Sequence, residues 1–291
     1  MTGMVVAPQP EAVEAGALAL RRGGNAVDAA ITCALVQGVV DPQMCGIAGF
    51  SLFNHQEGGQ ASLTSMHEAI HHRGPDASGT YLDEHIGLCH RRLSILDLSE
   101  AGNQPMFSAD GNLVIVFNGE IYNFLELRAE LEAEGVQFKS HTDTEVILAL
   151  YAREGTQCLG KLNGMFAFAI FDGRTGSLVC ARDRFAEKPF LYAETKNFFA
   201  FASEYKALLA LTDVSAALDH DRLFTFLIEP RRGLDDHRKT VFSDIQQLLG
   251  GEKLVLETET LAFQTIFPAH TWVLKRELLS EFLNLLIFIN L

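Results

Sequence analysis

The stretch DPQMCGIAGF, residues 41–50, contains Cys45, the cysteine of this sequence that is the strongest candidate for a reactive thiol. A cysteine thiolate can attack a carbonyl carbon and form a thioester, provided that a base removes the thiol proton. Small and apolar residues follow Cys45, a composition that is also typical of a buried strand with closely approaching neighbours. The stretch alone therefore leaves open whether Cys45 is a nucleophile or an ordinary strand cysteine.

A second pattern, H-E-x-x-H, is formed by His67, Glu68 and His71. On a helix this spacing can supply two zinc ligands and a general base. The sequence continues directly into HRGPD, which ends the helix, and no third ligand follows at a recognisable spacing. We therefore predict no metal at this pattern.

Three further clusters of polar residues lie at expected ends of strands and helices, where loops carry function. They are HRRLSILD at 90–97, FNGEIYN at 117–123 and HTDTEVI at 141–147. Each also has an ordinary interpretation. Arg92 could form a surface salt bridge, Asn118-Gly119 after an apolar strand is more typical of a tight turn, and Asp143 could be a helix N-cap.

The elements that must position these clusters can be read from hydrophobic periodicity and from turn residues. Helices are expected at 11–22, 26–40, 63–71, 124–134 and 144–153, and from Asp221 in DRLFTFLIE. Strands are expected in CGIAGFSLF, near 86–95 and 113–117, in MFAFAIFD, SLVCARD, PFLYAE and FFAFAS, and in EKLVLETE. Helices combined with two sets of antiparallel strands predict a layered α+β sandwich.

The overall composition excludes several classes of function. A formal net charge of -14 over 291 residues disfavours nucleic acid as a partner. Five scattered cysteines without CxxC spacing favour a reducing compartment, so we expect a cytoplasmic protein. No segment reaches the roughly 20 apolar residues of a membrane helix, and no signal peptide is recognisable.

The clusters occur together with other motifs in a fixed order. The set is MCGIAGF, HRGPD, RRLSILD, NQPM, FNGEIYN, LRAELEAEG, TDTEVILALY, LNGMFAFAIFD, ARDRF, KPFLY and FASEYKAL. It resembles the class II glutamine amidotransferases, most closely the glutaminase domain of asparagine synthetase. The resemblance covers residues 44–211 and continues weakly to about 260. It implies a four-layer αββα sandwich of the N-terminal nucleophile hydrolase type over residues 44–265.

The resemblance also implies roles for individual residues. Cys45 would be the nucleophile, with its own α-amine as the general base, while Asn118 and the backbone N–H of Gly119 would form the oxyanion hole. The substrate, glutamine, would be bound by its α-carboxylate at Arg92 and by its α-ammonium at Asp143, with Glu120 nearby. The resemblance adds Ile95 to the substrate-binding residues. No metal and no cofactor is implied.

The sequence departs from the family pattern in three places. Ala186 and Glu187 stand where glycine and an apolar residue are usual, so that turn is expected to be distorted. The S-G-G-x-D-S pyrophosphate loop of the synthetase half is missing, so a synthetase domain would have to act in trans. Residues 4–50 resemble the start of γ-glutamyltranspeptidase, which predicts a helical extension at 1–43.

The chain thus resembles a fusion, with an apolar C-terminal tail at 266–291. We expect glutamine hydrolysis if Cys45 becomes N-terminal, by processing or by initiation at Met44. The alternative is a non-catalytic, truncated fusion chain that keeps only the fold. A γ-glutamyl-binding remnant is a third interpretation.

Overall fold

The computed structural model describes residues 45–52, 59–94, 97–195, 198–228, 237–258 and 263–266. The helices expected at 11–22 and 26–40 lie outside the described residues, as does the tail beyond residue 266. The division of the chain at residues 43 and 265 stays a prediction.

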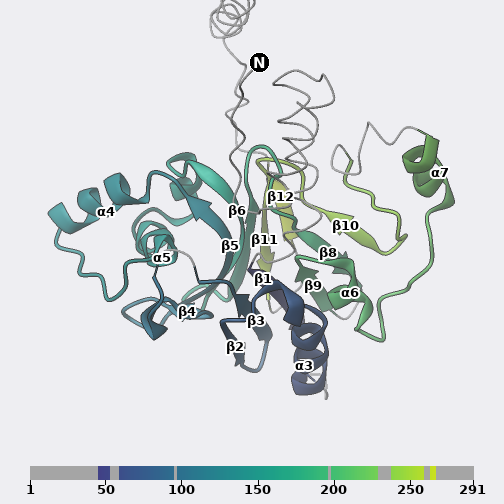
Figure 1. Ribbon diagram of the computed structural model, residues 1–291, viewed down its shortest axis with the longest axis horizontal. Coiled ribbons are helices and arrows are strands. Elements are labelled where there is room, and N and C mark those ends of the chain that lie inside the picture. Colours follow the sequence, from purple (N-terminus) through teal and green to yellow (C-terminus); the bar gives the residue numbers. More distant parts are fainter. Residues whose placement is uncertain are drawn as a thin grey trace, which may run out of the picture.

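Two antiparallel sheets of six strands each form the centre of the fold (Figure 1). The first sheet has the order β10 (Ile245–Gln247), β8 (Leu191–Glu194), β9 (Phe198–Ala202), β1 (Gly46–Leu52), β3 (Ile86–Arg92) and β2 (Ala77–Leu82). The second has the order β12 (Phe263–Ile266), β11 (Lys253–Glu257), β7 (Ser177–Arg182), β6 (Gly164–Asp172), β5 (Leu113–Ile121) and β4 (Met106–Phe107).

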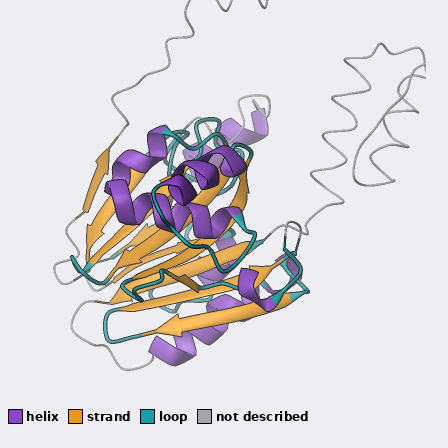
Figure 2. Cartoon of the chain, turned by 90° about the vertical axis from the view of Figure 1, so that its left-hand side faces the viewer, coloured by secondary structure: helices purple, strands orange, loops and turns teal. Residues whose placement is uncertain are grey.

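Helices cover the outer faces of both sheets, so the described residues form the expected four-layer αββα sandwich (Figure 2). The elements are α3 (Gly59–Ala69), α4 (Phe124–Ala133), α5 (Asp143–Glu154), α6 (Tyr205–Leu209) and α7 (His220–Ile228), with 3-10 turns η1 (His71–Arg73), η2 (Glu100–Gly102) and η3 (Gly155–Gly160). Helices α3 and α6 pack on the first sheet, and α4 and α5 pack on the second. None of these described helices is long and apolar enough to cross a membrane.

The middle of the sandwich is an apolar layer between the two sheets. It contains Ile47 and Leu88 from the first sheet, and Val114 and Val116 from the second. The residues that alternate with Val114 and Val116 along β5 instead pack against the helices of the second sheet. Because both faces of β5 are buried, its sequence LVIVF is apolar at every position and does not alternate with polar residues.

The ordinary interpretation of Asn118-Gly119 as a tight turn is wrong. Asn118 and Gly119 do not form a tight turn, because β5 continues through them to Ile121 and pairs them with β6. A Cβ atom on Gly119 would lie 2.2 Å from the carbonyl oxygen of Met165. The glycine is therefore required by the close approach of a neighbouring strand.

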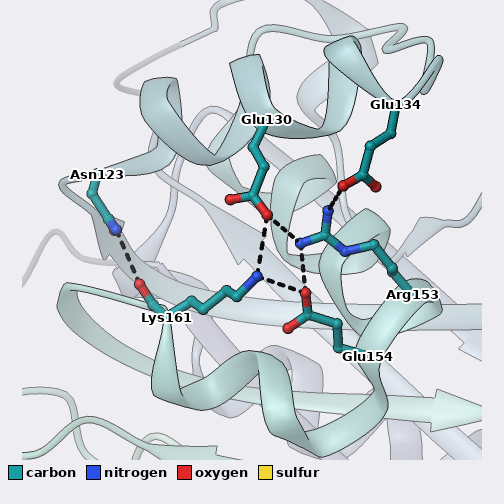
Figure 3. A network of polar contacts seen from close by, with 6 residues as sticks. All are labelled: Asn123, Glu130, Glu134, Arg153, Glu154 and Lys161. Atoms are coloured by element: carbon teal, nitrogen blue, oxygen red, sulfur yellow. Dashed lines mark hydrogen bonds and ion pairs between the residues drawn. The ribbon is translucent and has the colours of Figure 1, made fainter.

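A network of ion pairs on the surface fastens α4 to α5 and η3 (Figure 3). Arg153 binds Glu134 at 2.8 Å and Glu130 at 2.9 Å, and Lys161 also binds Glu130, at 3.2 Å. The carbonyl oxygen of Lys161 accepts a hydrogen bond from Asn123, 3.0 Å away. The network thus reaches the loop that follows β5, although exposed pairs of this kind contribute only about 0.2–1 kcal/mol each.

Candidate active site

Cys45 lies immediately before β1, at the edge where β1 pairs with the end of β3. Its Sγ atom accepts a hydrogen bond from the N–H of Leu93, 3.4 Å away, and lies 3.6 Å from the carbonyl oxygen of Leu93. Burial raises the pKa of the Cys45 thiol above its ordinary value, and the Leu93 contact and the nearby charges of Arg92, Lys188 and Arg73 offset only part of this rise. The thiol thus has a donor and three cations near it.

Arg73 holds the main chain of Cys45 in place. Its Nε atom donates to the Cys45 carbonyl oxygen at 3.3 Å, and its Nη1 atom donates to Glu204 at 2.7 Å. Glu204 also binds His72 at 2.8 Å and Lys206 at 3.1 Å. Sequence reasoning did not single out Arg73 or Glu204, although they lie in the quoted motifs HRGPD and FASEYKAL.

Residue 203 fixes the strand that follows Cys45. The hydroxyl of Ser203 accepts from the N–H of Ile47 at 3.1 Å, and the N–H of Ser203 donates to the Ile47 carbonyl oxygen at 2.9 Å. Ser203 and Glu204 are consecutive in the chain. The corner after β9 therefore anchors both Ile47, directly, and Cys45, through Arg73.

Asn118 lies near the end of β5, a strand that contacts both β1 and β3. Its side chain is 1% exposed, and its Nδ2 donor has no hydrogen-bond partner among the described residues. The preceding residue is held firmly, because the N–H of Phe117 donates to Gln104 at 2.6 Å and its carbonyl oxygen lies 3.1 Å from Nε2 of His90. An unpartnered buried donor costs about 1–3 kcal/mol, which an oxygen atom of a ligand would offset.

Arg92 ends β3 and is buried, so it is not the surface salt-bridge residue of the ordinary interpretation. Its Nη1 atom donates to the carbonyl oxygen of Ser99 at 2.8 Å and to Oδ1 of Asn103 at 2.9 Å. Its Nη2 atom donates to the carbonyl oxygen of Asp97. Among the described residues, none accepts a hydrogen bond from its Nε atom. Ile95 lies outside the described residues.

Asp143 is the first residue of α5, and Thr142 rather than Asp143 is the N-cap. The Asp143 carboxylate is buried and accepts from the N–H of Ile121, 2.9 Å away. Burial raises its pKa to about 6, and the neighbouring charge of Glu120 adds to this effect. A buried carboxylate of this kind would be stabilised by an ammonium group placed beside it.

The turn after β7 is formed despite its unusual sequence. Ala186 has a φ of 57°, which is left-handed and strained for a residue other than glycine. The carboxylate of Asp183 accepts from the N–H groups of Glu187 and Lys188, both at 3.0 Å. Arg182 donates to the carbonyl oxygens of Ala186 and Lys188, both at 2.7 Å. These bonds hold the turn and bury Lys188, whose charge acts on Cys45.

The H-E-x-x-H residues are engaged with the polypeptide. Nε2 of His67 lies 3.3 Å from the carbonyl oxygen of His90, and Glu68 pairs with Arg91 at 2.8 Å. Helix α3 ends at Ala69, so His71 lies in the following 3-10 turn. In the described part of the chain, no group of three or more His, Cys, Asp or Glu residues could hold a metal ion.

Comparison with known proteins agrees with this geometry. Residues 44–267 match the family model of the glutamine amidotransferase domain, and residues 12–70 match that of γ-glutamyltranspeptidase. Asparagine synthetase [glutamine-hydrolyzing] 1 of Bacillus subtilis is 40% identical over 236 residues, which are 78% of this chain and 36% of that protein. A putative asparagine synthetase [glutamine-hydrolyzing] 2 of Methanocaldococcus jannaschii is 43% identical over 190 residues, 59% of this chain and 36% of that protein.

Among solved structures, the glutamine phosphoribosylpyrophosphate amidotransferase of B. subtilis has a similar fold, with a TM-score of 0.56 at 18% identity. The match covers 78% of this chain and 50% of that one. The chain spans little more than a third of the two asparagine synthetases above, 36% of each. The motifs, the αββα layers and the match over residues 44–267 lead to one conclusion: the chain belongs to the glutamine amidotransferase domain family, and this domain is homologous to the glutaminase domain of asparagine synthetases.

Proposed function

We propose that this chain hydrolyses glutamine to glutamate and ammonia, with Cys45 as the nucleophile. The observation that carries the proposal is the side-chain amide of Asn118, which is buried with an unpartnered Nδ2 donor. Its strand, β5, contacts the strand that follows Cys45. A preorganised donor near a nucleophile stabilises the negative charge that develops on a carbonyl oxygen.

Two charged residues would orient the substrate. The free Nε edge of Arg92 offers a planar fork for the α-carboxylate of glutamine. The carboxylate of Asp143, with Glu120 nearby, would receive the α-ammonium group. The side-chain amide of glutamine would then extend toward Cys45 and Asn118.

The reaction needs a base for the thiol proton. A free α-amine on Cys45 titrates near ~7.7–8.0 and can accept that proton. The thiolate attacks the amide carbon, and Asn118 Nδ2 with the Gly119 N–H stabilises the oxyanion. The tetrahedral intermediate collapses to a thioester as the amine proton passes to the departing ammonia. Water, deprotonated by the same amine, attacks the thioester carbon; the C–S bond breaks, the Cys45 thiolate takes the proton back from the amine, and glutamate is released.

A free α-amine can be tested by comparing two forms of the protein. An internal peptide nitrogen is not basic, and loss of a positioned base costs roughly 10²- to 10⁴-fold. We expect the chain that begins at Met1 to be nearly inactive, and a chain that begins at Met44, with this methionine trimmed, to release glutamate. The N-termini are verified by mass spectrometry, and Cys45→Ser is the inactive control.

Equal activity from the intact 291-residue chain contradicts the α-amine mechanism. If neither form releases glutamate, the result favours the alternative, a non-catalytic fusion chain that keeps only the fold.

The fate of the ammonia is a separate part of the proposal. These 291 residues contain no S-G-G-x-D-S pyrophosphate loop, and a synthetase domain outside them would use the ammonia. We expect no asparagine when the chain is supplied with aspartate, glutamine, ATP and magnesium.

A cytoplasmic location is supported by the free thiols of Cys45, Cys89, Cys158 and Cys180.

A further inference from the structure

The segment 97–104, which follows Arg92 in the chain, folds back onto the Arg92 guanidinium. Three of the guanidinium hydrogen bonds go to this segment, to the carbonyl oxygens of Asp97 and Ser99 and to the side chain of Asn103. Arg92 is 6% exposed, so these contacts are shielded from water. The position of the guanidinium is thus set by the position of segment 97–104.

The same segment contacts the start of α5, where Asp143 lies. The Oδ2 atom of Asp97 accepts from the N–H of His141 at 3.0 Å, two residues before Asp143. A Cβ atom on Gly102 would lie 2.3 Å from Nη2 of Arg92 and 3.0 Å from Cγ2 of Thr142. Segment 97–104 is therefore packed tightly between Arg92 on one side and residues 141–142 on the other.

Asp97 makes these contacts with two different parts of the residue. Its carbonyl oxygen binds Arg92, while its carboxylate binds the N–H of His141 and, at 2.8 Å through Oδ1, the N–H of Ser99. Hydrogen bonds from these two N–H groups lower the pKa of the Asp97 carboxyl to about 2, so it is ionised at neutral pH. Both carboxylate oxygens act as acceptors, which a carboxamide cannot reproduce.

We propose that Asp97 is a positioning residue that couples the two ends of the glutamine site, Arg92 and Asp143. This inference rests on the proposed function, in which Arg92 takes the α-carboxylate and Asp143 the α-ammonium group. A ligand carboxylate that binds Arg92 also orders Asp97 and, through it, the residues before Asp143. Binding of the ligand ammonium group at Asp143 then costs less conformational entropy. Each ligand group therefore contributes more when the other is present, which is positive coupling.

The coupling can be measured by ligand binding to the form that begins at residue 45 and carries Cys45→Ser, so that no turnover occurs. The ligands are glutamine, 4-carbamoylbutanoate, which lacks the ammonium group, and 4-aminobutanamide, which lacks the carboxylate. We expect Asp97→Asn to weaken glutamine binding about 10-fold, within the range of typical coupling energies. The affinity of Asp97→Asn for each of the two single-group ligands should fall less than about 3-fold, because these ligands make only one of the two coupled contacts.

The chain offers a matched control in Asp110. Hydrogen bonds from Ser108 and Asn112 lower its pKa to about 2 as well, but it lies in the turn before β5. Asp110→Asn should leave the affinities for all three ligands unchanged. If Asp97→Asn fails to fold, as judged by circular dichroism, Gly102→Ala provides the second variant, since its new Cβ displaces both Arg92 and Thr142.

The possible outcomes separate the coupling from the proposed function. Unchanged glutamine affinity in Asp97→Asn overturns the coupling while the glutamine site stands. Equal losses for all three ligands also overturn it, because they indicate a purely structural role. If the parent does not bind glutamine at all, the proposed function fails and the coupling fails with it.

Discussion

The guanidinium of Arg73 joins the carbonyl oxygen of Cys45, at 3.3 Å, to the carboxylate of Glu204, at 2.7 Å. Arg73 lies in the 3-10 turn after α3, and Glu204 lies between β9 and α6. The candidate nucleophile is thus positioned by two segments that meet only in the folded chain. Removing the distant carboxylate should therefore change catalysis without changing any group that touches glutamine.

We expect Glu204→Gln to lower kcat for glutamine hydrolysis with little change in KM. The variant loses the charge that holds Arg73, and misplacement of a reacting group by about 1 Å can cost up to about 100-fold. Steady-state kinetics on the form that begins at Cys45 measure the effect. The matched control is Glu132→Gln, which removes an exposed pair with Arg128 on α4. A KM effect alone would contradict the positioning role.

Asn118→Ala should lower kcat by about 100- to 1000-fold, the usual effect of removing one oxyanion donor. KM should change little, because the contact is made mainly in the transition state. Thermal unfolding provides a second measurement. Since the Nδ2 donor is buried without a partner among the described residues, its removal should not destabilise the protein through a lost hydrogen bond. Unchanged kcat in a folded variant would exclude the oxyanion role.

The pH dependence of kcat/KM should report Asp143. Its pKa is raised to about 6, so below pH 6 the carboxyl is protonated and cannot pair with the α-ammonium of glutamine. The α-amine base, which titrates near ~7.7–8.0, already makes kcat/KM fall about tenfold per pH unit below that range, and we expect protonation of Asp143 to steepen the fall to about a hundredfold per pH unit below about 6. Asp143→Asn should lack the steeper part, and a parent profile that does not steepen between pH 6 and pH 5 would contradict the role of Asp143.

The same shift has a consequence for stability. Because the folded pKa lies above the unfolded value, the ionised carboxylate destabilises the fold increasingly as pH rises from about 4 to 6, and fully above 6. Without glutamine, Asp143→Asn should therefore stabilise the protein at pH 7 by up to about 3 kcal/mol. Urea unfolding at pH 7 and at pH 4 separates this effect from the loss of other contacts, since the gain should vanish at the lower pH.

Ala186→Gly should stabilise the protein by about 0.5–1 kcal/mol. The left-handed conformation costs a residue with a Cβ about 1–2 kcal/mol, and the greater freedom of glycine in the unfolded chain offsets part of the gain. Urea midpoints at constant m value measure the change. Gly111→Ala is the reverse control, because Gly111 has a φ of 75° and no atom within 4 Å of the position of a new Cβ. Stabilisation by both substitutions would refute the backbone explanation.

Much of the fold and the site could be predicted from local patterns. The apolar runs after Cys45 and before Asn118 are strands β1 and β5, and the helices expected near 124–134 and 144–153 are α4 and α5. Helices and strands of this length can be recognised from their own sequence, because burial of one or both faces requires apolar residues at the spacing typical of the element. The motif order also grouped Cys45, Arg92, Asn118 and Asp143 as candidate site residues, and their roles stay a prediction.

Other features were decided only by tertiary structure. Asn118-Gly119 reads as a turn locally, yet it is a strand because β6 approaches so closely that only glycine fits at position 119. Arg73 and Glu204 are 131 residues apart, and Asp97 and His141 are 44 apart. Neither pair leaves a periodic signal in the sequence. Such contacts form because packing of two sheets and their helices brings distant loops to one edge, and that packing depends on the whole chain at once.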